Sequence, residues 1–159
     1  MENDEKWMSV ALQQADLAFS LGEVPVGCVI VKENQLLGKG YNQVEMLKDA
    51  TAHAEILAIG AASSKLENWR LDGATLYVTL EPCPMCAGAI LNSRIARVVF
   101  GSPDSRCGAC GTKSDVLSNN ALGRQVEVFG GVLKEECLGL IQLFFRSMRT
   151  KKDDSGKKL

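Results

Sequence analysis

The chain of 159 residues contains one histidine, His53, and this residue lies close to a carboxylate. The local sequence is Thr51-Ala52-His53-Ala54-Glu55, at the start of a segment rich in helix formers. Because there is no second histidine, a catalytic triad built on histidine would have to use His53. A metal site with several histidine ligands is excluded for the same reason. A metal bound at His53 therefore needs partners of another type.

Two cysteines downstream have the spacing of metal ligands. Cys83 and Cys86 lie in Glu81-Pro82-Cys83-Pro84-Met85-Cys86, where an expected strand meets an expected helix with proline in its first turn. This spacing aims both sulfur atoms at one point, and the positive end of the helix favours their thiolate forms. A catalytic zinc ion takes three protein ligands and keeps its fourth position for water. His53, Cys83 and Cys86 therefore predict one catalytic zinc ion per subunit.

Glu55 is not needed to complete that ligand set, so it is free to move protons. A carboxylate beside zinc-bound water can accept its proton, and zinc lowers the pKa of that water to about 7. His-x-Glu followed by Pro-Cys-x-x-Cys is similar to the signature of zinc-dependent nucleobase deaminases. In that chemistry hydroxide attacks the carbon that bears the amino group. Glu55 then protonates a ring nitrogen and the leaving amine, and ammonia departs.

The remaining four cysteines have no evident ligand partners. Cys107-Gly108-Ala109-Cys110 could be a second zinc site or a redox pair, but His53 is already used. Only Cys28, in an apolar segment, and Cys137, on a helical stripe, are left to join it. We expect Cys107 and Cys110 to be small thiols in a glycine-rich loop, and Cys28 and Cys137 to be buried.

The elements that must position these residues alternate in a way typical of an α/β domain. Helices are expected over residues 8–19, 52–62, 84–92 and 133–144, and strands over 26–31, 35–41, 74–80, 97–100 and 126–129. The two first strands form a hairpin whose turn is Glu33-Asn34. This order predicts a three-layer α/β/α sandwich with one mixed central sheet. The domain spans residues 1–150, and residues 151–159 form a polar, basic, frayed tail.

Composition is that of an ordinary globular protein, with 46% apolar and 23% charged residues. No apolar run approaches the length of a membrane span, so no membrane partner is expected. The first residues are polar and mostly acidic, which is unlike a signal peptide. Closely spaced cysteines in a reducing compartment indicate metal binding or catalysis rather than disulfides. We therefore expect a cytoplasmic protein.

Charge is distributed unevenly along the chain. The formal net charge is −1, but residues 146–159 hold six basic and two acidic side chains. Phe144-Phe145 directly precede this basic end, and only part of the pair can lie on the buried stripe of the last helix. An exposed aromatic ring can stack on a splayed base, and nearby cations can bind phosphates. We expect RNA contacts from Phe145 and Arg146, whereas residues 151–159 are expected to be solvated.

Over residues 7–149 the sequence resembles the bacterial tRNA-specific adenosine deaminases of the cytidine and deoxycytidylate deaminase superfamily. The resemblance is carried by six segments, which are Val24-Pro25-Val26-Gly27, Gly40-Tyr41-Asn42, Thr51-Ala52-His53-Ala54-Glu55, Leu76-Tyr77-Val78-Thr79-Leu80-Glu81-Pro82-Cys83, Met85-Cys86-Ala87-Gly88-Ala89 and Arg97-Val98-Val99-Phe100-Gly101. It implies a cytidine-deaminase-like fold and conversion of the wobble adenosine in a tRNA anticodon stem-loop, chiefly of an arginine tRNA, to inosine. It also implies a homodimer.

The resemblance assigns roles to individual residues. The zinc ligands correspond to His53, Cys83 and Cys86, and the proton shuttle corresponds to Glu55. Asn42 corresponds to a residue that contacts the flipped nucleotide, and its amide can donate and accept hydrogen bonds at a purine edge. Asp104 lies in the loop that the resemblance places beside the anticodon nucleotides.

Three alternatives share some of these residues. A deaminase of a free nucleobase or nucleoside, such as guanine or cytosine, would have the same zinc site but would not need the basic aromatic end. A non-catalytic RNA-binding partner subunit would be expected to lack the shuttle, yet Glu55 is present. A structural zinc module would normally have a fourth ligand, and none is evident.

Overall fold

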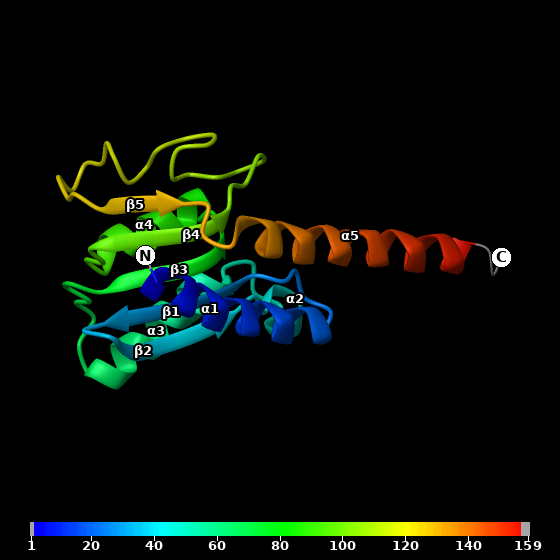
Figure 1. Cartoon of the computed structure of the whole chain (residues 1–159), viewed down its shortest axis with the longest axis horizontal. Coiled ribbons are helices and arrows are strands. Elements are labelled where there is room, and N and C mark those ends of the chain that lie inside the picture. Colours follow the sequence, from blue (N-terminus) through cyan, green and yellow to red (C-terminus); the bar gives the residue numbers. More distant parts are fainter. Residues whose placement is uncertain (1, 157–159) are drawn as a thin grey trace.

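The computed structural model describes residues 2–156 (Figure 1). Its helices are α1 (Glu2–Ser20), α2 (Val44–Leu47), α3 (Ala54–Leu66), α4 (Pro84–Asn92) and α5 (Lys134–Gly156). Its strands are β1 (Gly27–Lys32), β2 (Gln35–Tyr41), β3 (Thr75–Leu80), β4 (Arg97–Ser102) and β5 (Glu127–Gly130). Within the described residues, no helix is long and apolar enough to cross a membrane.

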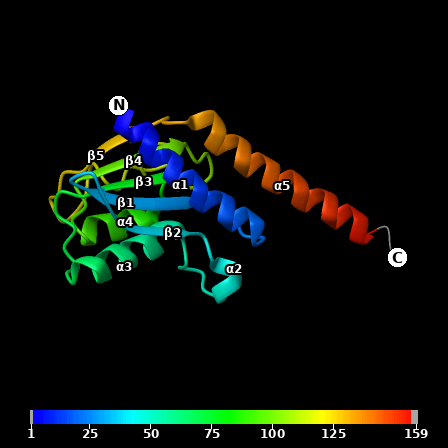
Figure 2. The same cartoon turned by 60° about the horizontal axis from the view of Figure 1, so that its bottom comes forward.

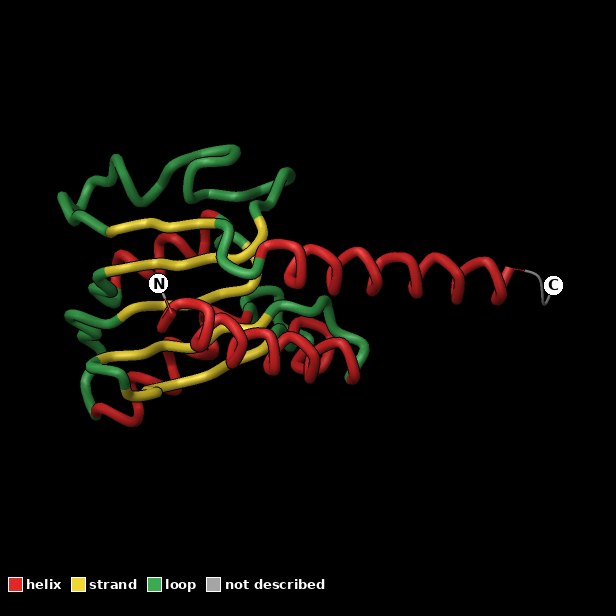
Figure 3. Tube along the Cα trace, in the orientation of Figure 1, coloured by secondary structure: helices red, strands yellow, loops and turns green. Residues whose placement is uncertain are grey.

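The five strands form one mixed sheet in the order β2-β1-β3-β4-β5 (Figure 3). β1 pairs antiparallel with both β2 and β3, whereas β3, β4 and β5 are mutually parallel neighbours. The β1–β2 hairpin turns at Glu33 and Asn34, which both have positive φ angles, of 52° and 60°. The parallel strands therefore all end at the same edge of the sheet, and the loops that follow them meet there.

Helices cover both faces of the sheet, which confirms the predicted α/β/α sandwich (Figure 2). One face packs on α3 and α4 through inward side chains such as Ile30, Leu76 and Val98. The other face packs on α1 and α5 through the alternate positions, among them Val29 and Tyr77. Because successive strand residues point to opposite faces, the strands buried on both sides consist of nearly uninterrupted apolar runs.

A close contact between β2 and α3 holds α3 against the sheet. A Cβ atom at Gly38 would lie 2.5 Å from the backbone nitrogen of Ala62, and one at Gly40 would lie 2.6 Å from the carbonyl oxygen of Ala54. Only glycine on the strand, facing small residues on the helix, permits this approach. The first turn of α3, which follows His53, is therefore held rigidly against the sheet.

Two parts of the secondary structure differ from the expectation. α2 was not expected, because four residues give no readable apolar period. The last helix continues to Gly156, so the expectation of a frayed tail from residue 151 is wrong for residues 151–156; residues 157–159 lie outside the described part of the chain. Residues 151–156 are exposed and contain no proline, but only Lys151 and Lys152 among them are good helix formers, so their composition does not account for the continued helix.

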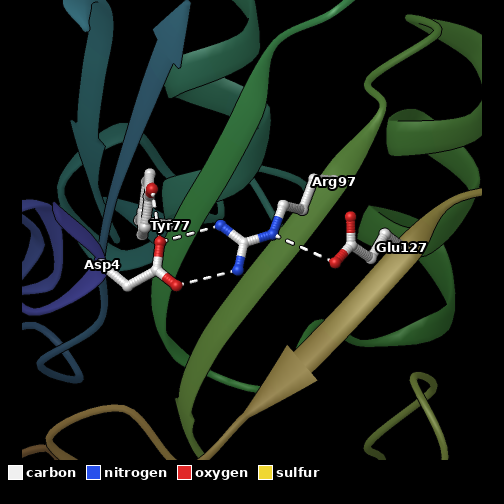
Figure 4. A network of polar contacts seen from close by, with 4 residues as sticks. All are labelled: Asp4, Tyr77, Arg97 and Glu127. Carbon is white, nitrogen blue, oxygen red and sulfur yellow. Dashed lines mark hydrogen bonds and ion pairs between the residues drawn. The ribbon is translucent and has the colours of Figure 1, made fainter. Parts of the chain in front are cut away.

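A buried polar network ties α1 to the sheet at the edge opposite the ends of β3 and β4 (Figure 4). Both carboxylate oxygens of Asp4 accept hydrogen bonds of 2.8 Å from the Arg97 guanidinium, and Asp4 also accepts one of 2.8 Å from the Tyr77 hydroxyl. Arg97 is also 3.7 Å from the exposed carboxylate of Glu127. The network therefore joins α1 to β3 and β4.

We expect Asp4→Asn to lower the free energy of unfolding by about 2 kcal/mol at pH 7, less than for a fully buried pair because Arg97 stays partly exposed. Hydrogen bonding from Arg97 holds the pKa of Asp4 below its ordinary value. A carboxyl of this kind stabilises the fold above its unfolded-state pKa, about 3.9, and the contribution is lost as the pH falls through the folded-state value. Urea unfolding at several pH values measures both effects. A difference between the two proteins that stays constant below pH 4 would contradict this account.

Candidate active site

The predicted metal ligands come together at the edge of the sheet where β3 ends, because each lies at a helix N-terminus. His53 is the N-cap of α3 and Cys83 is the N-cap of α4; both have extended backbone angles. Neither side chain makes a capping hydrogen bond to its own helix, so both are free to bind something else. Cys86 lies in the first turn of α4, after Pro84, and is completely buried.

The distances among these three side chains fit a zinc ion. His53 Nδ1 lies 3.6 Å from Cys83 Sγ and 3.6 Å from Cys86 Sγ. Zinc bonds of about 2.0 Å to nitrogen and 2.3 Å to sulfur, at a tetrahedral angle, would place those atoms about 3.5 Å apart. These residues form the only His, Cys, Asp and Glu cluster of this compactness within residues 2–156. The donor set therefore fits one zinc ion with three protein ligands.

The electrostatics of the cluster also suit a cation. A hydrogen bond from Cys86, with help from His53, lowers the pKa of Cys83 to about 4. The same hydrogen bond, followed by burial, raises the pKa of Cys86, and the hydrogen bond to Cys83 raises the pKa of His53. Two helix N-termini add partial positive charge beside the sulfur atoms. The cluster thus holds a thiolate and retains protons that metal binding would release.

Glu55 is in the first turn of α3, with 4% of its surface exposed. Burial raises the pKa of Glu55 above its ordinary value, and hydrogen bonds from its own backbone amide and from Cys86 oppose that rise. Glu55 lines the same pocket as His53 and Cys83. A carboxyl with a raised pKa inside a pocket can both accept and return a proton near neutral pH.

The pocket beside the cluster has a volume of about 460 Å³, which is large enough for a nucleoside. The Asn42 side chain lies on its wall, where Nδ2 is 3.4 Å from the carbonyl oxygen of Val24 and Oδ1 is 3.4 Å from the amide nitrogen of Val44. Both contacts are long, so the amide can exchange them for contacts with a ligand. The structure thus places Asn42 in the same pocket as His53 and Cys83, and its contact with a nucleotide stays a prediction.

Asp104 also lines this pocket, but its carboxylate is already used within its own loop. It accepts hydrogen bonds from the Arg106 amide at 2.9 Å and from the Cys107 thiol at 3.2 Å. Only 8% of its surface is exposed. Asp104 therefore shapes the turn that presents Arg106 and Cys107 to the pocket.

A second cavity of about 660 Å³ runs along α5, and it shares Leu80, Asp104 and Arg106 with the first. Phe145, Arg146 and Arg149 line it. The Arg106 guanidinium lies 5.8 Å from the centre of the Phe145 ring, whereas Phe144 is buried and packs edge-to-face on Phe19. The division of the pair into one buried and one accessible ring agrees with the sequence analysis. The structure places Phe145 and Arg146 in a cationic groove beside the pocket.

The other four cysteines are placed as the sequence indicates. All are free, Cys28 and Cys137 are buried in the two apolar layers, and Cys110 is buried, while Cys107 is exposed. Partial desolvation of the thiol, followed by its hydrogen bond to Asp104, raises the pKa of Cys107 to about 11 and so disfavours the thiolate form. Neither Cys107 nor Cys110 joins a cluster of ligands in the described part of the chain.

We therefore expect the double variant Cys107→Ser, Cys110→Ser to bind the same amount of zinc as the native protein. Elemental analysis of the purified proteins measures this directly. A drop of one zinc ion per chain would show that the second Cys-x-x-Cys is a metal site.

Sequence reasoning missed two buried glutamates that organise the loops around the pocket. Glu23 accepts hydrogen bonds from the amides of Met46, at 2.6 Å, and Glu45, at 3.2 Å, and so fixes α2 beside Asn42. Glu81 accepts hydrogen bonds from the loop after β4. Both are only 2% exposed. A charged residue within an otherwise apolar buried segment was the available signal, but its partners are 22 or more positions away.

Comparisons with known proteins agree with this geometry. A family model of the cytidine and deoxycytidylate deaminase zinc-binding region matches residues 1–102. The tRNA-specific adenosine deaminase of Bacillus subtilis (strain 168) is 46% identical over all of this chain and 99% of its own length. That of Haemophilus influenzae is 47% identical over 95% of this chain and 88% of its own.

A solved structure from work on A-to-I editing by tRNA:A34 deaminases at the wobble position of transfer RNA superposes with a TM-score of 0.82. It is 38% identical in sequence and covers 85% of this chain and 98% of its own. The similarity extends over almost the whole of that chain, so it includes the elements on both sides of the metal cluster.

Proposed function

We propose that this chain, a member of the cytidine and deoxycytidylate deaminase family, converts the wobble adenosine of a tRNA anticodon to inosine. Within that family it belongs to the zinc-dependent tRNA-specific adenosine deaminases. Full-length relatives with that activity in their names support the reaction. The observation that carries the proposal is the pairing of the His53, Cys83 and Cys86 cluster with Glu55 beside a nucleoside-sized pocket.

The adjoining groove supports a nucleic acid rather than a free base as substrate. It holds three arginines, Arg106, Arg146 and Arg149, next to the accessible ring of Phe145. A free nucleobase fits the pocket alone and gains nothing from such a groove. Flanking nucleotides of an anticodon loop, by contrast, offer phosphates to the arginines and bases to the aromatic ring.

Each group around the pocket has a separate role in the proposed reaction. Zinc, when bound, would act as a Lewis acid and lower the pKa of a water molecule. Glu55 accepts the proton of the attacking water and delivers it to a ring nitrogen of the purine. It then takes the proton of the hydroxyl group that has added to the carbon and passes it to the leaving amine, so that a carbonyl forms and ammonia departs. Asn42 binds the flipped purine nucleotide through an amide that donates and accepts. Glu55 is only 4% exposed, so few water molecules can surround its carboxylate during these transfers.

The finer assignments follow from the family. We propose that an arginine tRNA is the substrate, that the enzyme works in the cytoplasm as a homodimer, and that Asp104, Phe145 and Arg146 lie beside the nucleotides that flank the target. The basic end of α5 supports the RNA assignment, since Arg146 and Arg149 are both exposed there.

The decisive experiment incubates zinc-loaded protein with an arginine tRNA anticodon stem-loop and measures the released nucleosides by mass spectrometry. Inosine replacing the wobble adenosine is the expected result, and the Glu55→Ala protein is the control. Unchanged adenosine in the RNA, together with deamination of free guanine, cytosine or their nucleosides, would overturn the tRNA proposal and leave a free-base deaminase.

We expect Phe145→Ala to weaken binding of the stem-loop about tenfold, because one base–aromatic stack is lost. Leu143→Ala is the matched control, since Leu143 is an exposed apolar residue on the same helix, outside the groove. Truncation after Thr150 is expected to change the affinity by less than about threefold at physiological salt. Fluorescence anisotropy with labelled RNA compares all three. Equal losses for the Leu143 and Phe145 variants would argue against stacking.

A further inference from the structure

Glu81 is a buried carboxylate outside the ligand set, and it gathers four hydrogen bonds from one loop. It directly follows β3 and lies two residues before the ligand Cys83. Its Oε1 atom accepts a hydrogen bond from the Asp104 amide at 3.1 Å, and its Oε2 atom accepts those from the amides of Cys110 and Thr112 at 2.9 and 3.2 Å. The Thr112 hydroxyl donates the fourth, to Oε1.

The backbone next to Glu81 is joined to the same loop. The Glu81 amide donates to the carbonyl of Ser102 at 2.9 Å, and the Ala109 amide donates to the carbonyl of Pro82 at 2.9 Å. The segment that carries Cys83 and the loop of residues 104–112 therefore form one unit. Without the carboxylate, the amides of the buried residues Asp104 and Cys110 would lose their acceptor, as would the amide of the exposed residue Thr112.

Gly108 shows how closely the loop encloses this carboxylate. A Cβ atom at Gly108 would lie 2.5 Å from Oε1 and 2.6 Å from Oε2 of Glu81. That overlap exists only because the backbone of residue 108 passes directly over the carboxylate. The loop is thus wrapped around the Glu81 side chain rather than lying beside it.

The loop that Glu81 holds is also a wall of the pocket. Asp104, Arg106 and Cys107 line the pocket together with Glu55 and Cys83. Arg106 also contacts Phe145, so the loop connects the pocket with the groove on α5. Placement of this wall relative to the ligand Cys83 depends on the contacts of Glu81.

We propose that Glu81 is a positioning residue, whose carboxylate fixes the loop of residues 104–112 against the zinc-ligand segment and thereby sets the RNA-binding wall of the pocket. This inference rests on the proposed function for the nature of the substrate, but not for the loop itself. Glu81 acts through Asp104 and Arg106 rather than on the reacting atoms.

Glu81→Gln tests this because all four partners of the carboxylate are donors. The amide of glutamine has the same shape but must point its NH₂ group at one pair of them. The NH₂ group is better tolerated at the position of Oε1, because the Thr112 hydroxyl there can turn and accept a hydrogen bond from it. The Asp104 amide at the same position can only donate, so it loses its acceptor and the Asp104 end of the loop is released. We expect hydrogen exchange in peptides covering residues 103–107 to accelerate about tenfold, while peptides in β4 are unchanged.

Kinetics of the same variant measure the consequence for substrate. We expect about a tenfold rise in KM for the anticodon stem-loop, with kcat within about threefold of native and one zinc ion per chain. Asp4→Asn is the matched control: it removes a buried, hydrogen-bonded carboxylate charge at the other end of the sheet. That variant should unfold more easily but keep the native KM and native exchange in residues 103–107.

Three results would overturn the proposal. These are unchanged exchange in residues 103–107, loss of zinc with Glu81→Gln, or a fall in kcat with KM unaltered. If Glu81→Gln does not fold, Thr112→Val replaces the donating hydroxyl by a methyl group of similar size and must still accelerate exchange in residues 108–112. The exchange measurement uses no RNA, so a chain inactive on tRNA would refute the proposed function without deciding the role of Glu81.

Discussion

Replacing Glu55 by alanine is expected to lower kcat for deamination about 10³-fold while the protein still binds one zinc ion. The carboxylate lies in the pocket next to the ligands, but the three atoms that fit the metal belong to His53, Cys83 and Cys86. Its removal takes away the group that we propose as the proton shuttle, and leaves the proposed ligand set intact. Elemental analysis gives the zinc content, and nucleoside mass spectrometry gives the rate.

Glu55→Gln separates the loss of proton transfer from a loss of packing, because glutamine has nearly the same volume as glutamate and Glu55 is only 4% exposed. We expect it to be as inactive as the alanine variant. A glutamine variant with near-native turnover would refute the assignment of Glu55 as the proton shuttle, and loss of zinc would show that Glu55 supports the metal instead.

Replacing Cys86 by alanine is expected to abolish both zinc binding and activity. Two ligands remain, which is fewer than catalytic zinc sites use, and Cys86 is completely buried, so water cannot easily replace its sulfur. Zinc present at 100 times its Kd stabilises the native protein by about 2.7 kcal/mol, and the variant should lose that increment. Thermal unfolding with and without added zinc measures it.

Cys28→Ala is the matched control for this experiment. Cys28 is also completely buried, in the apolar layer shared with α3 and α4, but lies outside the ligand cluster. It should lose stability through the cavity alone and keep its zinc-dependent increment in Tm. A chelator should inactivate the native enzyme, and added zinc should restore it. If the Cys86 variant retained zinc-dependent stabilisation, the three-ligand assignment would be wrong.

The metal site could be predicted because its information is local. His53, Cys83 and Cys86 each lie at a helix N-terminus that short sequence signals reveal, and Glu55 follows His53 in the same helical turn. The layers could be predicted for a related reason. Apolar runs of strand length between helix-forming segments imply a sheet that is buried on both faces.

What could not be predicted depends on contacts between distant residues. Glu45, Met46 and Leu47 are good helix formers, but α2 is too short to show an apolar period, and its contact with Glu23, which accepts hydrogen bonds from two of its amides, joins distant positions. Glu81 could be seen as part of a motif, but its four donors come from a loop 23 to 31 positions away. Asp104 was expected to lie beside RNA, and only the structure reveals that its carboxylate accepts hydrogen bonds within its own turn.

The network joins the beginning of the chain to β4, so α1 can be fixed to the sheet only late in synthesis. Asp4 and Arg97 are 93 positions apart, so at roughly 5–20 residues per second the ribosome adds Arg97 about 5–20 s after Asp4. During those seconds Trp7 and Met8 lack Val99 and Cys137, which complete their apolar layer. The apolar face of the first helix therefore cannot be fully covered until most of the domain has been synthesised.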